Sequence, residues 1–367
     1  MYRWPEHDLN QSCASSTLGV LLHTSMRLSV SPDSNSTTSP QLLDKVLHWS
    51  SRLPLALLQS FGRLLAGLLL WLPDKGLART VYRNLKLCFP AWSEQQLRQV
   101  TRQAVRHQIL AFLEFLRCWG NPPNDSLQRI HTVHNLALLE QALADPKGCL
   151  AIVPHHGSWE IMNAWLNQRA APVIMYKPDD NPSLNRFVLQ ARSRLNATLV
   201  PTDDSGVRQI FRTLKTGGFS ILLPDHLPDR SGGIESAFFG WPVLTSTLAS
   251  KLAQKTQCAV VVLSCLRRED DPQRFDIVVD PINPNIYQRD LQQSVNALNR
   301  SIEQLIQRHP AHYHWSYKRF KLVDHLQGYY HVDTAEQAEQ IRLAGLQATA
   351  RTTNATTPVS AATDQPE

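Results

Sequence analysis

The sequence contains no Cys-x-x-Cys pair, and its six cysteines are scattered along 367 residues. Three of them stand in apolar runs of strand length, where a free cysteine behaves as a small buried hydrophobic residue. The cysteines are Cys13, Cys88, Cys118, Cys149, Cys258 and Cys265. This usage is typical of a reducing compartment and argues against a zinc site built from cysteines. A His-Glu-x-x-His spacing, which holds zinc on one face of a helix, is absent as well.

The first and last stretches of the chain lack hydrophobic periodicity. Residues 1–40 are dense in Ser, Thr, Asn and Pro, and their one apolar run, residues 18–22, is too short for the core of a signal peptide. We therefore expect a flexible N-terminal extension there, with Met26 as an alternative to Met1 for the start of translation. Residues 333–367 are rich in Ala, Thr and Gln, and we expect a disordered tail.

A long apolar run without polar interruption is also lacking. The most apolar stretch, residues 53–73, has Gln59 and Arg63 in its middle. About 20 apolar residues span a bilayer, and a central arginine costs about 3 kcal/mol on insertion scales, offset in part by snorkelling. We therefore expect residues 41–75 to form either one membrane anchor helix or a helix lying in the interface, with Trp71 near the lipid headgroups. A buried core helix is the alternative.

Positive charge exceeds negative charge: 37 Lys and Arg against 31 Asp and Glu give a net charge of +6 and a pI near 9.1. That balance suits an acidic partner, such as anionic lipid, nucleic acid or an acidic carrier protein, and does not choose among them. Arg79, Arg83 and Lys86 follow the apolar stretch, and by the positive-inside rule they place the body of the protein on the cytoplasmic side of a membrane. Hydrophobic residues make up 43% of the chain, which suffices for one large domain at residues 76–325.

Strand-like and helix-like segments alternate through that domain, which predicts an α/β fold with a central, mixed and mostly parallel sheet flanked by helices. One apolar strand ends at Pro154, and a His-His-Gly-Ser turn leads from it into a helix that begins near Trp159. In an open α/β sheet, ligands gather where strands end and helices begin. Glu160 lies in the first turn of this helix, where its carboxylate can reach back to His155 while Ser158 caps the helix. An imidazole oriented by a carboxylate is a general base for a hydroxyl group; capping and packing roles are the alternative.

Two further strands also end in polar residues. One is followed by Tyr176 and Lys177, and the other by Asp225 and His226. Side chains at the carboxyl ends of several strands converge on one site when the strands are parallel. A zinc site is an open alternative, since two to three histidines with a carboxylate make a plausible ligand set. Its members would be His155, His156, His226 and Glu160.

Glu114 stands out within the amphipathic helical segment at residues 95–119, because its sequence neighbours are Phe and Leu. A carboxylate in that company either faces water or needs a partner. We expect solvent exposure.

Five ordered blocks between residues 50 and 325 resemble the late lipid A biosynthesis acyltransferases of bacteria. These belong to the lysophospholipid acyltransferase superfamily, whose signature is a histidine, four residues, then an acidic residue. Residues 155–160, His-His-Gly-Ser-Trp-Glu, are similar to the family's His-x-Gly-Asn-Trp-Glu, and His226 stands where the family has glutamine. The other blocks are Asn84-Leu85 with Cys88-Phe89-Pro90, Tyr176-Lys177 with Asn181-Pro182, Phe238-Phe239-Gly240, and Pro310 to Phe320 with Tyr313, Trp315, Lys318 and Arg319.

This resemblance implies an enzyme, an O-acyltransferase of the bacterial inner membrane with its catalytic domain on the cytoplasmic side. The implied donor is an acyl carrier protein thioester, and the implied acceptor is a phosphorylated glycolipid, a lipid A precursor. It implies no cofactor and no metal. It assigns catalytic roles to His155 and Glu160 and supporting roles to Arg192 and Asp225. The substrate-binding residues that it implies are Tyr176, Lys177, Phe238, Phe239, Gly240, Lys318 and Arg319.

Basic and aromatic residues interleave at residues 310–321, a pattern that would also suit nucleic acid. No RNP-like or helix-turn-helix pattern accompanies them, so we expect no nucleic-acid partner. Three other functions stay open: acylation of a different lipid acceptor, a metal-dependent hydrolase using His155, His156 and Glu160, and a catalytically idle membrane-associated binding protein.

Overall fold

The computed structural model describes residues 40–71 and 76–355; the expected N-terminal extension before residue 40 and the end of the expected tail lie outside the described residues. The helices are α2 (Pro40–Ser51), α3 (Leu55–Trp71), α4 (Gly76–Cys88), α5 (Glu94–Gly120), α6 (Pro123–Leu127), α7 (Leu136–Leu143), α8 (Trp159–Leu166), α9 (Pro182–Arg192), α10 (Asp204–Lys215), α11 (Leu248–Thr256), α12 (Leu291–Arg308) and α13 (Ala335–Ala355). The strands are β1 (Ile130–His134), β2 (Cys149–Ile152), β3 (Pro172–Met175), β4 (Thr198–Val200), β5 (Phe219–Leu222), β6 (Gly233–Phe238), β7 (Trp241–Ser246), β8 (Ala259–Arg267) and β9 (Phe275–Pro281). Short 3₁₀ turns are η1 (Arg230–Gly232), η2 (Pro284–Tyr287), η3 (Pro310–His312) and η4 (Asp324–Leu326).

A seven-stranded sheet with the order β1-β9-β8-β2-β5-β3-β4 forms the centre of the fold. Its neighbouring strands pair in parallel, except that β8 and β9 pair antiparallel. Strands β6 and β7 form a separate antiparallel hairpin. The predicted α/β fold with a mixed, mostly parallel sheet is therefore confirmed.

The central strands are buried on both faces. In β2, Leu150 and Ile152 belong to one hydrophobic core together with residues of α10, α11 and α12, whereas Cys149 and Ala151 belong to a second core with residues of α7 and α8. Every residue of β2 and of β5 is buried. This explains why both strands are continuous apolar runs in the sequence, and it leaves only the strand ends for polar side chains.

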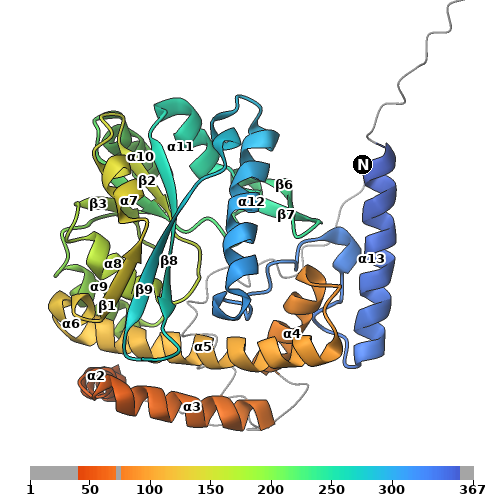
Figure 1. Cartoon of the computed structure of the whole chain (residues 1–367), viewed down its shortest axis with the longest axis horizontal. Coiled ribbons are helices and arrows are strands. Elements are labelled where there is room, and N and C mark those ends of the chain that lie inside the picture. The colour runs from red at the N-terminus through yellow and green to blue at the C-terminus, as the bar shows by residue number, and fades with distance from the viewer. Residues whose placement is uncertain (1–39, 72–75, 356–367) are drawn as a thin grey trace, which may run out of the picture.

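Helix α5 runs beneath the sheet, and α3 lies along the side of α5 that faces away from the sheet (Figure 1). One face of α3 is buried: Gln59 is 1% exposed, and a Cβ at Gly62 would lie 2.7 Å from Leu113 of α5. The opposite face carries a row of apolar side chains that are 55% to 80% exposed, namely Leu57, Phe61, Leu64, Leu68 and Trp71. Helix α3 is therefore half-buried, and the buried-core alternative describes only its inner face.

No single helix in the described ranges is long and apolar enough to cross a bilayer. Residues Leu42–Ser51 and Leu55–Trp71 meet the length and composition of a span only together, and the two helices are bent by 114° at their junction. The membrane anchor or interfacial helix expected for residues 41–75 stays a prediction.

The chain after residue 333 is not disordered throughout, because α13 occupies Ala335–Ala355; the expectation of a disordered tail is wrong for these residues. The segment before α13 is tied to α4 by Arg83, whose guanidinium donates to the backbone oxygens of Tyr329 and Val332, both at 2.8 Å. Ala338 of α13 is buried against the core. Alanine is a strong helix former, and tertiary contacts of this kind stabilise a helix whose composition has few large apolar residues.

The turn between β2 and α8 depends on Gly157, which has a φ of +71°. Its N–H donates to the backbone oxygen of His312 at 2.9 Å. A Cβ at this position would lie 1.9 Å from the carbonyl oxygen of Cys265 in β8, so the backbone of the turn lies directly against that strand. Only glycine combines this conformation with this close approach.

We predict that Gly157→Ala destabilises the fold far more than Gly240→Ala. Gly240 also has a positive φ, +81°, but a Cβ there would meet no atom within 4 Å, so we expect a cost of about 1 kcal/mol from the backbone conformation alone. In Gly157→Ala the new methyl group clashes with a backbone carbonyl, which should cost more than about 4 kcal/mol, enough to prevent stable folding. Thermal unfolding of the purified variants measures both effects. Similar melting temperatures for the two variants would contradict the close approach of the turn to β8.

Candidate functional site

Two neighbouring strands end in the same local pattern, an apolar strand followed by a proline and a polar residue. The chain continues from β2 through Val-Pro to His155, and from β5 through Leu-Pro to Asp225. Ile152 pairs with Leu222 in the parallel register of these strands, so residues three positions later lie opposite each other. The sheet thus brings His155 and Asp225 together, although 70 residues separate them in the sequence.

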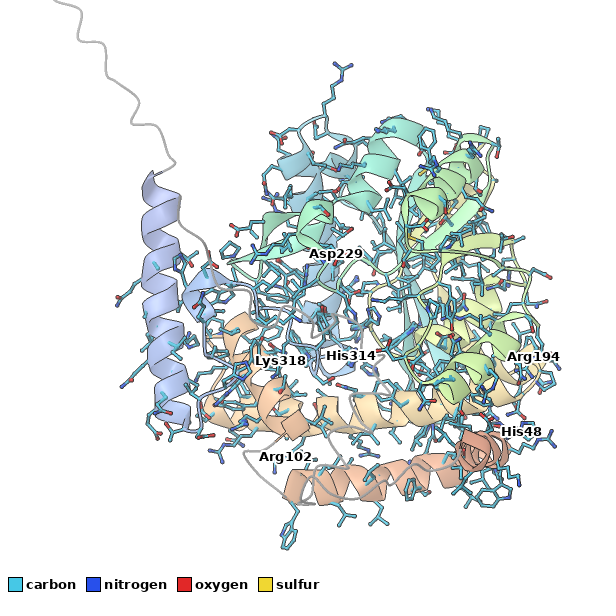
Figure 2. All side chains as sticks on the ribbon, turned by 180° about the vertical axis from the view of Figure 1, so that it is seen from behind. His48, Arg102, Arg194, Asp229, His314 and Lys318 are labelled. Carbon is cyan, nitrogen blue, oxygen red and sulfur yellow. The ribbon has the colours of Figure 1, made fainter. Side chains whose placement is uncertain are left out.

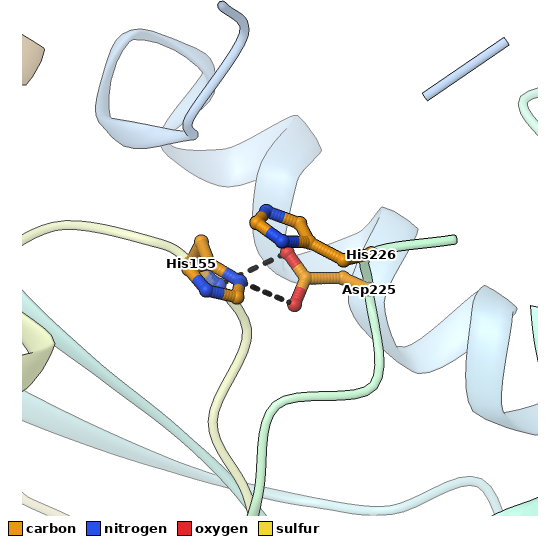
Figure 3. A group of neighbouring side chains, drawn as sticks. All are labelled: His155, Asp225 and His226. Carbon is orange, nitrogen blue, oxygen red and sulfur yellow. Dashed lines mark hydrogen bonds and ion pairs between the residues drawn. The ribbon is translucent and has the colours of Figure 1, made fainter. Parts of the chain in front are cut away.

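Asp225 accepts two hydrogen bonds from His155, one from the backbone N–H at 3.0 Å and one from the ring Nδ1 at 2.9 Å (Figure 3). The carboxylate is 2% exposed. Burial alone would raise its pKa, but the charge and hydrogen bonds of His155 hold the pKa of Asp225 below its usual range. An ionised carboxylate only accepts hydrogen bonds, so Nδ1 of His155 carries a proton, and in the neutral ring the free lone pair is on Nε2. That is the tautomer of a general base.

Glu160 pairs with Arg192. Its Oε1 accepts a hydrogen bond at 3.0 Å from Nη2 of Arg192, the last residue of α9. The expectation that Glu160 orients His155 is therefore not met in this geometry, because the partner of the ring is Asp225. Glu160 and Arg192 nevertheless line the same cavity as His155. The sequence placed Glu160 near His155 in the backbone, but the tight turn at Gly157 directs the two side chains toward different elements.

His226 stacks on the ring of His155, with ring centroids 3.7 Å apart and an interplanar angle of 2° (Figure 3). Tyr317 stacks on His226 in turn, at 3.9 Å and 13°. Burial, and then the neighbouring His155, lower the pKa of His226 well below its usual value, so this ring stays neutral. Its Nε2 is buried without a hydrogen-bond partner in the described part of the chain. The stack fixes the plane of the His155 ring.

A metal site is the alternative use of this cluster, since ligand atoms of His155, Asp225 and His226 lie within 4.8 Å of one another. Each imidazole, however, binds a metal through a lone pair in its ring plane, at a metal–nitrogen distance of about 2.0 Å. Two parallel rings 3.7 Å apart direct their lone pairs into parallel planes and cannot share one ion. His156, a member of the predicted ligand set, is fully buried and bonds instead to the backbone oxygen of His309 at 3.0 Å. The geometry thus favours acid–base chemistry.

A cavity of about 530 Å³ lies beside His155, a size typical of small-molecule sites. Side chains from α5, α8, α9 and the ends of β3 and β5 form its walls, which are largely apolar. Its apolar members include Phe115, Trp159, Met162, Leu184 and Ile221. The sequence offered no signal for these residues, because a cavity wall has the same apolar character as a core. Such a cavity suits a hydrocarbon chain whose reactive end lies at His155.

Two of the predicted substrate-binding residues, Tyr176 and Lys177, line this cavity. The ring of Tyr176 lies 5.1 Å from the guanidinium carbon of Arg192, and its hydroxyl bonds to Asn185. The Nε of Arg192 is buried without a hydrogen-bond partner among the described residues. Glu160 and Tyr176 thus hold Arg192, and its Nε–H is the donor that has no partner among the described residues.

The Phe238-Phe239-Gly240 block does not line the cavity. It forms the tight turn of the β6–β7 hairpin, where Phe239 has a φ of +49° and Gly240 one of +81°. Phe238 is 1% exposed, and the N–H of Phe239 donates to Glu303 at 2.6 Å. The block is therefore a packed turn outside the cavity, and its implied part in substrate binding stays a prediction.

Arg319 and Lys318 also lie outside the cavity walls. Arg319 is 2% exposed, and its guanidinium donates to the backbone oxygen of Leu244 and the hydroxyl of Thr245 in β7. Lys318, labelled in Figure 2, lies 5.7 Å from the ring centroid of Tyr330. Burial, and then the nearby arginines and lysine, lower the pKa of Lys318. Arg319 therefore has a structural role, and Lys318 belongs to a basic region away from the cavity.

Comparison with known proteins identifies the family of this chain. The family described as bacterial lipid A biosynthesis acyltransferase matches residues 45–322. The chain is 23% identical over 244 residues to the lipid A biosynthesis lauroyltransferase of Escherichia coli K12, covering 66% of this chain and 79% of that protein. It is 23% identical over 239 residues to the palmitoleoyltransferase of the same organism, covering 65% and 77%. A lipid A biosynthesis acyltransferase of Haemophilus influenzae is 26% identical over 235 residues, covering 63% and 72%. The match spans β2, β5 and the cavity, and the chain belongs to the bacterial lipid A biosynthesis acyltransferase family and is a transferase of acyl groups.

Proposed function

We propose that this protein transfers a fatty acyl chain from an acyl carrier protein thioester to a hydroxyl of a lipid A precursor, with His155 as general base. The observation that carries this proposal is the hydrogen bond between Asp225 and Nδ1 of His155. Asp225 occupies Nδ1, and Nε2 is left as the proton acceptor beside an apolar cavity of about 530 Å³. The family supplies the acceptor class; the donor, the roles of the residues and the location are our inference.

The reaction needs one proton acceptor and no covalent enzyme intermediate. Nε2 of His155 removes the proton of the acceptor hydroxyl, and the oxygen attacks the thioester carbonyl. The carbon–sulfur bond then breaks, and the departing thiolate takes the proton back from the imidazolium. Asp225, held ionised in a buried position, stabilises that imidazolium while it exists.

Arg192 is the candidate for stabilising the negative charge that develops on the carbonyl oxygen. It lines the cavity, and its Nε is a buried donor that lacks a partner within the described ranges. The N-terminus of α8, which begins four residues after His155, adds N–H groups of the same polarity. Glu160 then acts on the reaction indirectly, because its carboxylate fixes the guanidinium of Arg192 at 3.0 Å.

The donor and the acceptor both carry negative charge, which suits a protein with a net charge of +6. Acyl carrier protein is an acidic partner, and a lipid A precursor is a phosphorylated glycolipid. Lys177 lines the cavity and is the basic residue placed to meet such a group there.

We place the exposed row of α3 against a lipid bilayer, on the cytoplasmic side of the inner membrane. The acceptor of the family is a lipid, and the row Leu57, Phe61, Leu64, Leu68 and Trp71 forms one continuous apolar face. Arg63, whose guanidinium bonds to Ser60 at 2.9 Å on the exposed side, has a stem long enough to reach the headgroups. A helix with one buried and one apolar exposed face fits a position in the interface.

The first test of the proposed function is acyl transfer by the purified full chain, with an acyl carrier protein thioester as donor and a lipid A precursor as acceptor. We expect His155→Ala to lower kcat by about 100- to 10,000-fold, because the reaction loses its base. Asp225→Asn should lower kcat by at least about 100-fold, since the amide can hold the wrong tautomer. Normal activity of His155→Ala would overturn the mechanism. Transfer by wild type to another lipid, but not to the lipid A precursor, would change the acceptor.

The pH dependence of kcat/KM separates the two carboxylates. Asp225 has a lowered pKa and stays ionised above its usual value of about 3.9, so it causes no break between about pH 5 and 9. In Asp225→Asn the imidazolium loses its counter-ion and deprotonates more readily. Because protonated His155 lowers the pKa of Asp225, Asp225 in turn favours the imidazolium, and the acid limb of the profile should move to lower pH in this variant. Glu160→Gln is the matched control, because this carboxylate is paired with Arg192 and the limb should stay in place. A limb that moves only in Glu160→Gln would restore Glu160 as the partner of His155.

Sedimentation with vesicles tests the membrane face of α3. The double variant Phe61→Asp/Leu64→Asp should bind vesicles of neutral lipid with an added phosphatidylglycerol fraction about 100-fold more weakly, since about 3 kcal/mol of apolar burial is lost. Leu343→Asp, at a side chain of α13 that is 47% exposed, is the matched control and should bind as wild type does. Unchanged binding of the double variant would place the membrane contact elsewhere.

A further inference from the structure

Glu114 is a buried charge that the proposed mechanism does not use. Solvent exposure was expected for it, but the residue is 0% exposed, so that expectation is wrong. Its carboxylate is satisfied from three elements: Arg267 of β8 donates to both oxygens at 2.5 and 2.7 Å, Gln59 of α3 donates to Oε1 at 3.0 Å, and the hydroxyl of Ser158 donates to Oε2. A buried carboxylate with this many donors has a fixed position.

The charge of the cluster is balanced within it. Arg267, 6% exposed, neutralises Glu114 and also donates from Nη1 to Nδ1 of His107 at 2.7 Å. Burial, and then the charge of Arg267, lower the pKa of His107 to about 3, so His107 is neutral and accepts this bond. The ion pair is thus complete without Ser158 and Gln59, and these two side chains are connections to other parts of the molecule.

Ser158 connects Glu114 to the turn that carries His155. The sequence indicated that Ser158 caps α8, but it makes no side-chain cap bond, and its hydroxyl points to α5 instead. Backbone bonds also hold the turn: the N–H of Ser158 donates to Cys265 at 2.8 Å, and the oxygen of His155 accepts from His314 at 3.0 Å. Glu114 supplies a charged side-chain bond that ties the start of α8 to α5, beside the weaker one from Cys118 to the backbone oxygen of Glu160 at 3.5 Å.

Gln59 connects the same carboxylate to the apolar helix α3. Its Nε2 donates to Glu114 and, at 2.6 Å, to the backbone oxygen of Pro272 in the loop between β8 and β9. Gln59 is 1% exposed and lies on the inner face of α3, opposite the exposed apolar row. A polar residue in the middle of an apolar stretch is unfavourable in a spanning helix. Here the two hydrogen bonds of Gln59 explain why this position is polar.

We propose that Glu114 is a positioning residue for acyl transfer: it clamps Ser158 so that the turn bearing His155 keeps its geometry, and Gln59 makes α3 part of this clamp. The proposal rests on the proposed function only for its kinetic consequence. A base displaced by about 1 Å loses about 100-fold in rate, so a single side-chain bond to the turn has a measurable effect. Because Gln59 belongs to the clamp, a shift of α3 relative to α5 should also change the rate of acyl transfer.

The experiment combines steady-state kinetics with hydrogen exchange of the full chain. Ser158→Ala and Gln59→Leu each remove one donor and leave the Glu114–Arg267 pair in place. We expect kcat to fall about 10- to 100-fold with KM nearly unchanged, and peptides covering residues 154–160 to exchange about 10-fold faster. Ser158→Asn keeps a donor at this position and should retain the wild-type values of both.

The matched control is Arg83→Met. Arg83 is another buried charge, 5% exposed, whose two bonds hold the segment before α13. Its loss should lower the melting temperature and loosen residues 329–332, while kcat and the exchange of residues 154–160 stay as in wild type. A loss of kcat in Arg83→Met as large as in Ser158→Ala would show that general destabilisation causes the effect, and would overturn the proposal.

Coupling between the residues gives the second criterion. Because Glu114 acts through Ser158, the double variant Glu114→Gln/Ser158→Ala should lower kcat no further than Glu114→Gln alone. Losses that multiply would overturn the proposal, as would wild-type exchange of residues 154–160 in Gln59→Leu and Ser158→Ala. The exchange measurement needs no substrate, so it decides the clamp even where the wild-type protein transfers no acyl chain from the donor used.

Discussion

The site depends on one buried, ionised carboxylate. Asp225 lies at the end of a strand whose residues are all buried, where an unpaired charge would be strongly unfavourable. The backbone N–H and the ring of His155 each donate a hydrogen bond to it, so a contact that satisfies Asp225 also sets which ring nitrogen of His155 carries the proton. Stability and chemistry therefore require the same register between β2 and β5.

The ring of His155 is constrained in its plane as well as at its nitrogen. His226 stacks on it, Tyr317 stacks on His226, and the N–H of Leu227 donates to the Tyr317 hydroxyl at 2.9 Å. The lowered pKa of His226 keeps this neighbour uncharged, which avoids repulsion with the imidazolium of the proposed reaction. His226, the residue after Asp225, thus supports a face of the His155 ring, whereas Asp225 holds the ring at Nδ1.

Helix α5 joins the site to the periphery. Its residue Glu114 bonds to the start of α8, to β8 and to α3, and its apolar residues reach the cavity wall. The outer face of α3 is apolar and exposed, and its inner face carries Gln59 in the same cluster. The helix α3 and the turn that carries His155 are thereby linked by two hydrogen bonds to one carboxylate.

The sequence by itself determined the α/β class, the strand ends that carry His155 and Asp225, and the family, because apolar strands that end in polar residues are local patterns. Arg192, to which the resemblance assigns a supporting role, lines the same cavity as His155. Only the tertiary structure decided that Asp225 and not Glu160 holds the imidazole, that Glu114 is buried, and that the Phe-Phe-Gly block is a hairpin turn. Spacing along the chain sets which backbones are close within one turn, whereas the direction of a side chain depends on its neighbours from other elements. Asp225 is 70 residues from His155, and Arg267 is 153 residues from Glu114, so sheet register and helix packing bring these partners together.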